Sequence, residues 1–191
     1  MRIIAGACRG RSLQAPMGQV TRPTADRVRQ ALFDTLAHAS WAGADLLRGA
    51  HVLDGFAGTG ALGLEALSRG AASALFVEQD RAALRCLRDN VRSCGLLERA
   101  TIRACDMLRL PPRGAATSAD LVFLDPPYNQ DLPGRALAVL QRGGWLHAGT
   151  LIVVETAATE APPVAAQHLL LERRHGAACL YAWRHGANDN G

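Results

Sequence analysis

The chain has 191 residues, of which 49% are hydrophobic and 20% charged, a composition typical of one compact domain and not of a disordered or fibrous protein. All 21 basic residues are arginine, so Schiff-base chemistry and the lysine of a phosphate-binding P-loop are excluded. The apolar runs are far shorter than a membrane span, the start lacks the apolar core of a secretory signal, and the five cysteines form no Cys-x-x-Cys pair. We therefore expect a cytoplasmic protein without a membrane segment or a metal centre.

The N-terminal fifth of the chain carries the entire excess of positive charge. Residues 1–35 hold six arginines and two acids, a balance of +4 that equals the formal net charge of the chain. Arginine pairs with phosphate through two parallel hydrogen bonds, and each neutralised phosphate releases a counterion, so this cluster suits a nucleic acid. The alternative is an ordinary solvated surface. The candidate contact residues are Arg9, Arg11, Arg22, Arg27 and Arg29.

Short elements are predicted for the same region. Strands over 2–5 and 11–15 flank a loop, and a helix over about 25–38 follows them, with apolar residues at every fourth position on one face. We interpret residues 1–40 as a small extension, a hairpin plus a helix, which precedes a domain over 41–187.

Beyond residue 50 the sequence alternates between strands and helices. Apolar runs predict strands over 51–54, 74–78, 100–104, 120–124 and 150–155. The segments between them predict helices over 59–69, 81–94 and 133–142. This βαβ pattern with continuously apolar strands indicates an α/β fold, whose mainly parallel sheet is covered by helices on both faces. Two closely spaced runs leave no room for a helix and predict a terminal antiparallel hairpin over 168–174 and 178–184.

A glycine-rich turn follows the first strand of the predicted sheet. The segment Asp54-Gly-Phe56-Ala57-Gly58-Thr59-Gly60 joins this strand to a helix, and its small residues let backbone amides approach a ligand. Because ligands of open α/β sheets bind at the carboxyl ends of the strands, we expect a binding site here. Three glycines also fit the Gly-x-Gly-x-x-Gly pattern, which leaves a dinucleotide open as an alternative ligand.

Two acids follow neighbouring strands at the same edge of the predicted sheet. Glu78 ends the second strand, where a carboxylate can accept hydrogen bonds from both hydroxyls of a ribose. Asp106 comes just after the third strand and can accept from an adenine amine. The alternatives are a surface charge for Glu78 and a loop cap for Asp106. Together with the glycine turn, the two acids predict a cleft for a nucleoside.

A second motif, Asp125-Pro126-Pro127-Tyr128, follows the apolar strand over 120–124. The two prolines lack backbone N–H groups, so this turn is rich in hydrogen-bond acceptors. The carboxylate of Asp125 and the carbonyl of Pro126 can accept both hydrogens of an exocyclic amine, and Tyr128 supplies a ring on which a base can stack. A tight strand exit with a packing tyrosine is the alternative. The neighbouring cleft favours a site for a nucleobase amine.

The two motifs together resemble S-adenosylmethionine-dependent methyltransferases that act on amino nitrogen. Such class I enzymes share a seven-stranded Rossmann-like sheet with a terminal antiparallel hairpin. Three segments are further similar to the RsmD family of bacterial 16S ribosomal RNA guanine-N2 methyltransferases, namely GACRGR at 6–11, RPTADRVR at 22–29 and FAGTGALGLEALSR at 56–69. The resemblance runs from residue 2 to about 155. Cys8 stands where family members often carry an aromatic residue, and Gln30 where glutamate is common.

The resemblance implies methyl transfer from S-adenosylmethionine to the N2 amine of a specific guanine in 16S rRNA, in a small ribosomal subunit or its assembly intermediate. The basic extension would face the RNA. The implied cofactor-binding residues are Asp54, Phe56, Ala57, Gly58, Thr59, Gly60, Glu78 and Asp106, and the implied catalytic residues are Asp125, Pro126, Pro127 and Tyr128. The alternatives are an adenine-N6 methyltransferase acting on DNA or RNA, a glutamine-modifying protein methyltransferase, a dinucleotide-dependent oxidoreductase, and a catalytically silent RNA-binding protein of the same fold.

Overall fold

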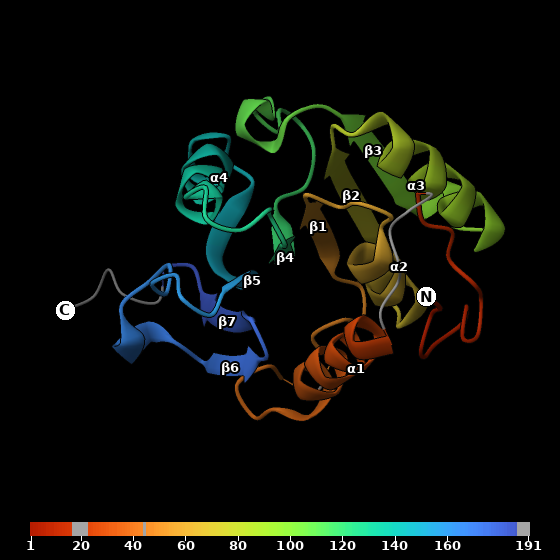
Figure 1. The fold of residues 1–191 in the computed structure, drawn as a ribbon. Helices are drawn as coiled ribbons and strands as arrows, with labels where there is room; N and C mark the ends of the chain where they lie inside the picture. The colour runs from red at the N-terminus through yellow and green to blue at the C-terminus, as the bar shows by residue number, and fades with distance from the viewer. Residues whose placement is uncertain (17–22, 44, 187–191) are drawn as a thin grey trace.

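Seven strands form one sheet in the order β3-β2-β1-β4-β5-β7-β6 in the computed structural model, which describes residues 1–16, 23–43 and 45–186 (Figure 1). The strands are β1 (His51–Gly55), β2 (Ser73–Glu78), β3 (Ala100–Ala104), β4 (Ala119–Leu124), β5 (Leu146–Ala157), β6 (Leu171–His175) and β7 (Ala178–Arg184). Strands β1 to β5 pair in parallel, whereas β7 is antiparallel to both of its neighbours. The predicted α/β class, the mainly parallel Rossmann-like sheet and the terminal hairpin are confirmed.

Among the described residues, three α-helices connect strands of the sheet and a fourth precedes β1. They are α1 (Pro23–His38), α2 (Ala61–Ser68), α3 (Arg81–Ser93) and α4 (Leu132–Arg142), and short 3-10 turns lie at Leu97–Arg99, Met107–Arg109 and Ala166–His168. Helix α2 begins at Ala61, two residues later than predicted, because Gly60 adopts a left-handed conformation with φ 81°. No helix in the part of the chain that the structure describes has the length and apolarity to cross a membrane.

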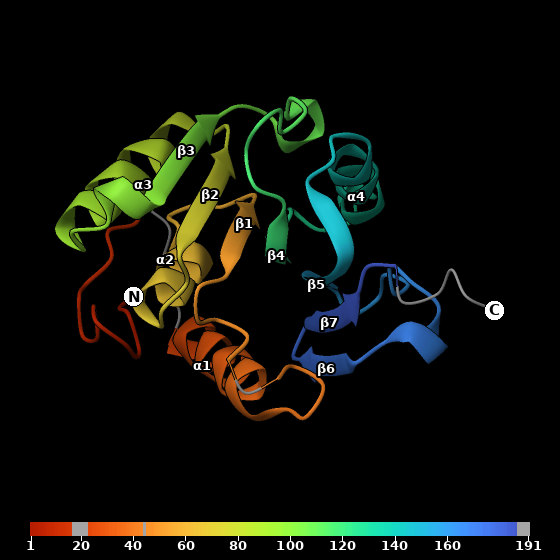
Figure 2. The same cartoon turned by 180° about the vertical axis from the view of Figure 1, so that it is seen from behind.

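The sheet separates two hydrophobic clusters. Val52 and Phe76 pack in a cluster with α1, α2 and α3, whereas the next residues along the same strands, Leu53 and Val77, pack in a second cluster with α4. Successive side chains of a strand point to opposite faces, so α1, α2 and α3 cover one face of the sheet and α4 covers the other. Figures 1 and 2 show α4 on the opposite side of β4 and β5 from α1 and α2.

Strand β5 is longer than the predicted strand over 150–155, because it continues past an irregularity in its pairing with β4. Ala119 pairs with Leu146, but Leu121 already pairs with Leu151. The extra residues of β5 are held there by Thr150, whose hydroxyl donates to the Ala119 carbonyl at 2.7 Å. The apolar run stops short of this segment, so the sequence pattern gave no strand signal there.

The N-terminal arm, residues 1–16, folds back on itself as predicted, but with less regular pairing. A single antiparallel bridge joins Arg2 to Ser12 where two strands were predicted. Backbone hydrogen bonds of 2.9 Å run from the Leu13 amide to the Met1 carbonyl and from the Ile3 amide to the Arg11 carbonyl. Ile3 and Leu13 are buried in the cluster beneath α1, so one side of the arm belongs to the core.

Two buried side chains of α2 hold the arm in place. The carboxylate of Glu65 is fully buried and accepts hydrogen bonds from the backbone amides of Ile4 at 2.8 Å and Ala5 at 3.0 Å. Ser68 donates its hydroxyl to the Ala5 carbonyl at 2.5 Å. Gly6 has φ 81° and packs so closely that a Cβ atom would lie 1.8 Å from the Ser68 carbonyl oxygen. The arm is therefore fixed to the helix that begins at the glycine turn.

Candidate active site

Acidic residues end the apolar runs of four parallel strands at one edge of the sheet. These residues are Asp54 in β1, Glu78 in β2, Asp125 directly after β4, and Glu155 in β5. Asp54 pairs with Phe123, and Phe123 pairs with Val153. Asp125 and Glu155 each lie two residues further along their strands, and residues two apart share a face. Asp54, Asp125 and Glu155 therefore point toward the face that α1 and α2 cover.

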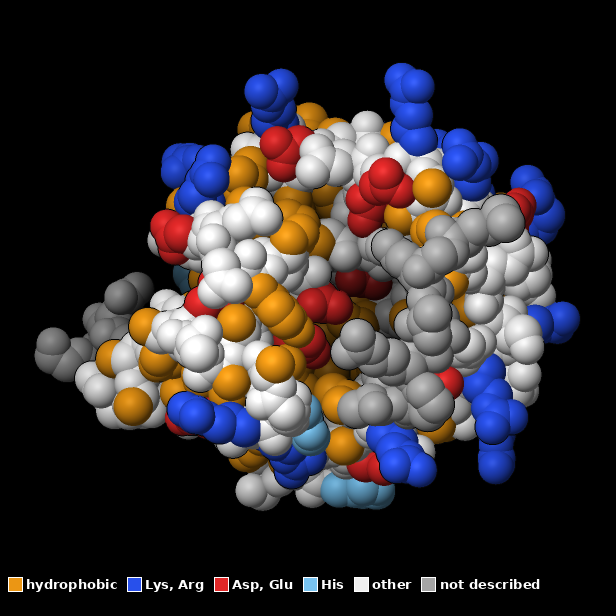
Figure 3. Space-filling view, in the orientation of Figure 1, with side chains coloured by type: hydrophobic (Ala, Val, Ile, Leu, Met, Phe, Trp, Pro, Cys, Tyr) orange, Lys and Arg blue, Asp and Glu red, His pale blue; other side chains and the backbone are white. Residues whose placement is uncertain are grey.

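These three acids line one cavity of about 680 Å³. Its wall also contains Arg29 of α1, the glycine turn from Phe56 to Thr59, Tyr128, and the turn between β6 and β7. Figure 3 looks onto this face, where acidic side chains gather inside the central hollow and arginines project from the periphery. The volume lies within the range of sites for small organic ligands and cofactors.

The glycine turn presents its backbone to this cavity. Gly58 has φ 54°, and a Cβ atom there would meet nothing within 4 Å, so its side of the turn is open to a ligand. Gly60 faces the protein instead, because a Cβ atom would lie 2.4 Å from the Leu87 side chain. Asn90 of α3 supports the turn by donating to the Thr59 carbonyl at 3.0 Å. The turn is therefore held by the protein on one side and open to the cavity on the other.

Asp54 both stabilises the start of α2 behind the glycine turn and lines the cavity. Its side chain is 2% exposed and accepts a hydrogen bond from the Gly63 amide at 2.9 Å. Burial raises the pKa of Asp54 to about 8, the Gly63 hydrogen bond opposes this rise, and the charges of Asp125 and Glu78 add to it. The carboxyl group is thus protonated at neutral pH unless a cation enters the cavity.

Asp125 lines the cavity. Desolvation by the surrounding protein and the nearby charge of Glu155 together raise the pKa of Asp125 to about 7. Tyr128 donates its hydroxyl to Oε1 of Glu155 at 2.5 Å and is 37% exposed. Burial and this hydrogen bond to a carboxylate raise the pKa of the Tyr128 hydroxyl. The hydroxyl is therefore held as a donor, and the ring stays at the cavity wall.

Most of the residues predicted to form the site meet in this cavity, and some do not. Asp54, Phe56, Ala57, Gly58, Thr59, Asp125 and Tyr128 line it, whereas Gly60, Glu78, Asp106, Pro126 and Pro127 do not. Glu78 holds the glycine turn, because its Oε2 accepts from the Gly58 amide at 2.7 Å. Asp106 caps the 3-10 turn at Met107–Arg109 by accepting from the Leu108 amide at 2.9 Å, so its adenine contact stays a prediction.

Two titratable residues of the cavity wall were missed by the sequence analysis. Glu155 ends an apolar run in the same way as Asp54 and Glu78, and this repeated pattern was the signal that could have found it. His175 ends β6, and its Nε2 atom is buried without a hydrogen-bond partner among the described residues. Only the pairing of β6 with β7 brings His175 to the cavity, and no sequence pattern showed that register.

The predicted RNA-facing arginines divide into three groups. Arg9, Arg11 and Arg27 are exposed, and Arg22 lies outside the described residues. The prediction that Arg29 belongs to an exposed basic surface is wrong. Its side chain is 5% exposed and donates to the Arg2 carbonyl at 2.5 Å and to Asp26 at 3.1 Å. Arg29 therefore joins α1 to the arm from inside.

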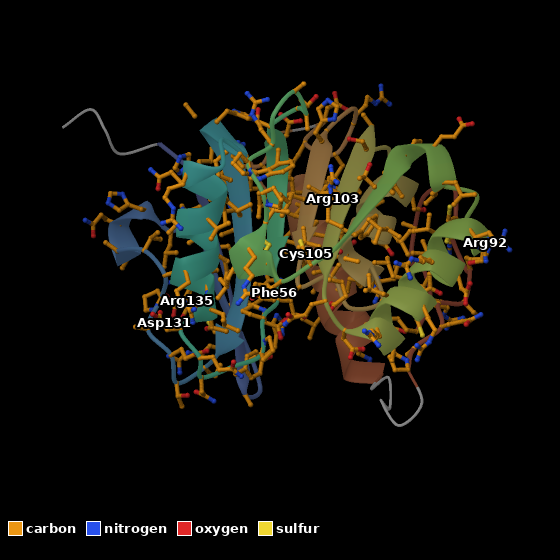
Figure 4. The ribbon with its side chains drawn as sticks, turned by 90° about the horizontal axis from the view of Figure 1, so that it is seen from above. Phe56, Arg92, Arg103, Cys105, Asp131 and Arg135 are labelled. Atoms are coloured by element: carbon orange, nitrogen blue, oxygen red, sulfur yellow. The ribbon has the colours of Figure 1, made fainter. Side chains whose placement is uncertain are left out.

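Helix α3 carries a row of exposed arginines that the sequence analysis did not single out. The spacing of these residues places them on one side of the helix, and they are Arg81, Arg85, Arg88 and Arg92. Figure 4 shows Arg92 on the outer side of α3, away from the sheet, with Phe56 and Cys105 near the centre of the molecule. The buried side of α3 binds the arm, because Asn90 accepts from the Gln14 amide at 2.7 Å. The arm and the arginine row therefore belong to neighbouring surfaces.

Comparison with known proteins places this chain in a family. Residues 1–184 match the family model described as "Conserved hypothetical protein 95". "Ribosomal RNA small subunit methyltransferase D" of Escherichia coli K12 is 38% identical over 173 residues, which cover 91% of this chain and 83% of that protein. The chain belongs to the RsmD family. The family member of Haemophilus influenzae, which has the same name, is 38% identical over 160 residues, covering 82% of this chain and 78% of that protein.

A solved structure of a similar protein has the same fold. The structure of a putative methyltransferase of Escherichia coli, yhhF, superposes with a TM-score of 0.80 at 36% identity, covering 96% of this chain and 97% of that one. The resemblance to the RsmD family that was inferred from the segments at 6–11, 22–29 and 56–69 is confirmed. Among the described residues, no group of three or more His, Cys, Asp or Glu side chains is placed to hold a metal ion.

Proposed function

We propose that the protein transfers a methyl group from S-adenosylmethionine to the N2 amine of a guanine in 16S rRNA. The observation that carries this proposal is that Asp125 opens into the same cavity as the backbone of the glycine turn. An amine acceptor and a nucleoside-binding turn share one space, as methyl transfer to an amine requires. The names of the RsmD relatives support ribosomal RNA of the small subunit as the substrate. We further propose that the enzyme acts in the cytoplasm on a small subunit or its assembly intermediate.

The cavity fits S-adenosylmethionine in charge and in shape. Asp54, at the glycine turn, gives the cavity a carboxyl group that suits a ligand with cationic sulfonium and ammonium groups. Gly58 lets the ligand approach the backbone closely, and Glu78 supports the same turn from the end of β2. When bound, S-adenosylmethionine supplies an electrophilic methyl group on a positively charged sulfur. All other steps fall to residues of the chain.

Asp125 orients the amine from the cavity wall, and the Pro126 carbonyl, which does not line the cavity, stays the predicted second acceptor. The lone pair of the guanine amine is delocalised into the ring, so the amine is planar and weakly nucleophilic in the ground state. Acceptance of its two hydrogens by Asp125 and Pro126 favours the pyramidal nitrogen that develops in the transition state. Tyr128 supplies a ring against which the base stacks. The proton that the methylated nitrogen loses passes to Asp125 or to water.

The direct test is methyl transfer from labelled S-adenosylmethionine to small ribosomal subunits that lack the modification, compared with free 16S rRNA. We expect label in N2-methylguanine at one position, mapped by mass spectrometry of RNA fragments. Label in adenine would replace this proposal by an adenine-N6 methyltransferase. Failure to bind S-adenosylmethionine in equilibrium dialysis would leave a catalytically silent RNA-binding protein as the better explanation.

The arm supplies a second prediction, concerning RNA affinity. Reversing the charge of Arg9 and Arg11 together should flatten the dependence of log binding constant on log salt by roughly 0.7 to 0.9 for each lost phosphate contact. A matched control reverses Arg135 and Arg142, which are also exposed but lie on α4, on the other face of the sheet. Filter binding at several salt concentrations measures both slopes. An arm variant with the wild-type slope would remove the arm from the RNA interface.

A further inference from the structure

We infer that Glu155 is a specificity-determining residue that accepts a hydrogen bond from N1–H of the target guanine. This inference rests on the proposed function and extends it from the methylated amine to the base edge beside it. Glu155 lies in the cavity wall with Asp125 and Tyr128, and the Asp-Pro-Pro-Tyr motif does not include it.

The strand register places Glu155 next to the amine-binding residue. Leu124 pairs with Val154, so Asp125 and Glu155 are the next residues on two neighbouring parallel strands. Adjacent strands lie about 4.8 Å apart, and both side chains point to the same face. The two carboxyl groups therefore stand side by side along one wall of the cavity. Two hydrogen-bond donors that are adjacent on one ligand edge match this arrangement.

The Tyr128 hydroxyl fixes one oxygen of Glu155 and leaves the other available. It donates to Oε1 at 2.5 Å, and Oε2 makes no hydrogen bond to any residue that the structure describes. An ionised carboxylate only accepts hydrogen bonds, so Oε2 presents an acceptor to the cavity. Glu155 thus combines a fixed orientation with a free acceptor position, as recognition of a single donor requires.

The base edge of guanine supplies the complementary donors. Its N2 amine and its N1–H lie next to each other, so Asp125 can hold the amine while Glu155 accepts from N1–H. Adenine presents an acceptor at N1, and a carboxylate facing it would be left without a donor. A site built to hydrogen-bond one substrate group strongly rejects analogues that lack it. Two donors from guanine also relieve the repulsion between two neighbouring carboxylates.

The test uses small subunits reconstituted with 16S rRNA that carries either guanine or 2-aminopurine at the mapped methylation position. The base 2-aminopurine retains the N2 amine but has an acceptor at N1. We expect wild-type kcat/KM to fall by about 10²-fold or more on 2-aminopurine. In Glu155→Gln, the amide can donate to N1 of 2-aminopurine, so the guanine rate should fall and the preference for guanine should shrink at least tenfold. Equilibrium binding of S-adenosylmethionine should stay within about threefold of wild type.

Glu172→Gln is the matched control, because Glu172 is exposed on β6 and does not line the cavity. It should retain the wild-type preference for guanine. Equal wild-type rates on guanine and 2-aminopurine would overturn the inference, and this comparison needs no variant to fold. A Glu155→Gln enzyme that loses both rates equally would also overturn it. If the wild-type enzyme methylates neither RNA, the proposed function itself fails and the role of Glu155 falls with it.

Discussion

Replacing Asp125 with alanine is expected to lower the rate of methyl transfer by about 10²- to 10⁴-fold. Asp125 is the acidic side chain of the Asp-Pro-Pro-Tyr turn that lines the cavity, and alanine removes its contact with the amine. Cofactor affinity should stay nearly unchanged, because Asp54 and the glycine turn remain in place. The loss therefore appears in turnover at saturating S-adenosylmethionine and not in cofactor binding.

Single-turnover transfer to small subunits, together with calorimetric titration of S-adenosylmethionine, separates these two quantities. Asp45→Ala is the control, because Asp45 is exposed and far along the chain from the motif. A near-normal turnover in Asp125→Ala would remove Asp125 from the chemistry.

The pH dependence of the wild-type enzyme gives the same residue a second signature. The pKa of Asp125 is raised to about 7, so its carboxylate forms as the pH rises through neutrality. Only the ionised carboxylate carries no competing proton and is a pure acceptor for its amine hydrogen, so kcat/KM should increase with pH around a midpoint near 7. Asp125→Asn has no such titration and should show a flat profile over this range, at a lower rate.

Replacing Glu65 with glutamine is expected to lower the free energy of unfolding by about 3–5 kcal/mol. Glu65 is fully buried, and Arg69 at 2.8 Å and Arg29 at 3.9 Å surround its carboxylate. It also accepts from the Ile4 and Ala5 amides. Glutamine leaves Arg69, which is 13% exposed, without its counter-charge, removes one of the two carboxylates beside Arg29, and turns an amide donor toward other donors.

Urea unfolding followed by circular dichroism measures this change, and Glu98→Gln on the exposed surface is the control, with an expected change within about 0.5 kcal/mol. Hydrogen exchange should also show faster exchange at the Ile4 and Ala5 amides, because they lose their acceptor. A Glu65→Gln protein with the wild-type unfolding midpoint would show that these contacts do not stabilise the fold.

The fold was largely predictable because each parallel strand is a continuous apolar run that ends in an acidic residue or a turn. Strand β3 is an exception, because apolar and polar side chains alternate along it, but its observed bounds, and those of β7, coincide with the predicted ones. The start of β5 was not predictable, since Gly149 and His147 interrupt the apolar run. Its pairing depends on the irregularity opposite Ala119, which only the neighbouring strand can specify.

The site was predictable where a motif combines chemistry with position, and not where burial decides the role. Counting charges placed Arg29 on the basic surface, yet Arg29 shares a helix face with Phe33 and Leu36, both fully buried. The spacing of four and three residues from Arg29 to Phe33 and Leu36 can be read from the sequence, but an arginine side chain is usually exposed, and this favoured a surface position. The sequence left two roles open for Asp106, an adenine contact and a loop cap. Only the folded 3-10 turn shows that its carboxylate accepts a hydrogen bond from the Leu108 amide.

Helix α2 sets a fixed span between two parts of the protein. Its eight residues cover about 12 Å, the glycine turn adjoins one end, and Glu65 and Ser68 fasten the arm along its length. The distance between the glycine turn and the arm is fixed, because a change in the length of α2 would break the hydrogen bonds of this helix. On the proposed function, a nucleic acid held by the arm would meet the methyl donor at a distance that the backbone of one short helix determines.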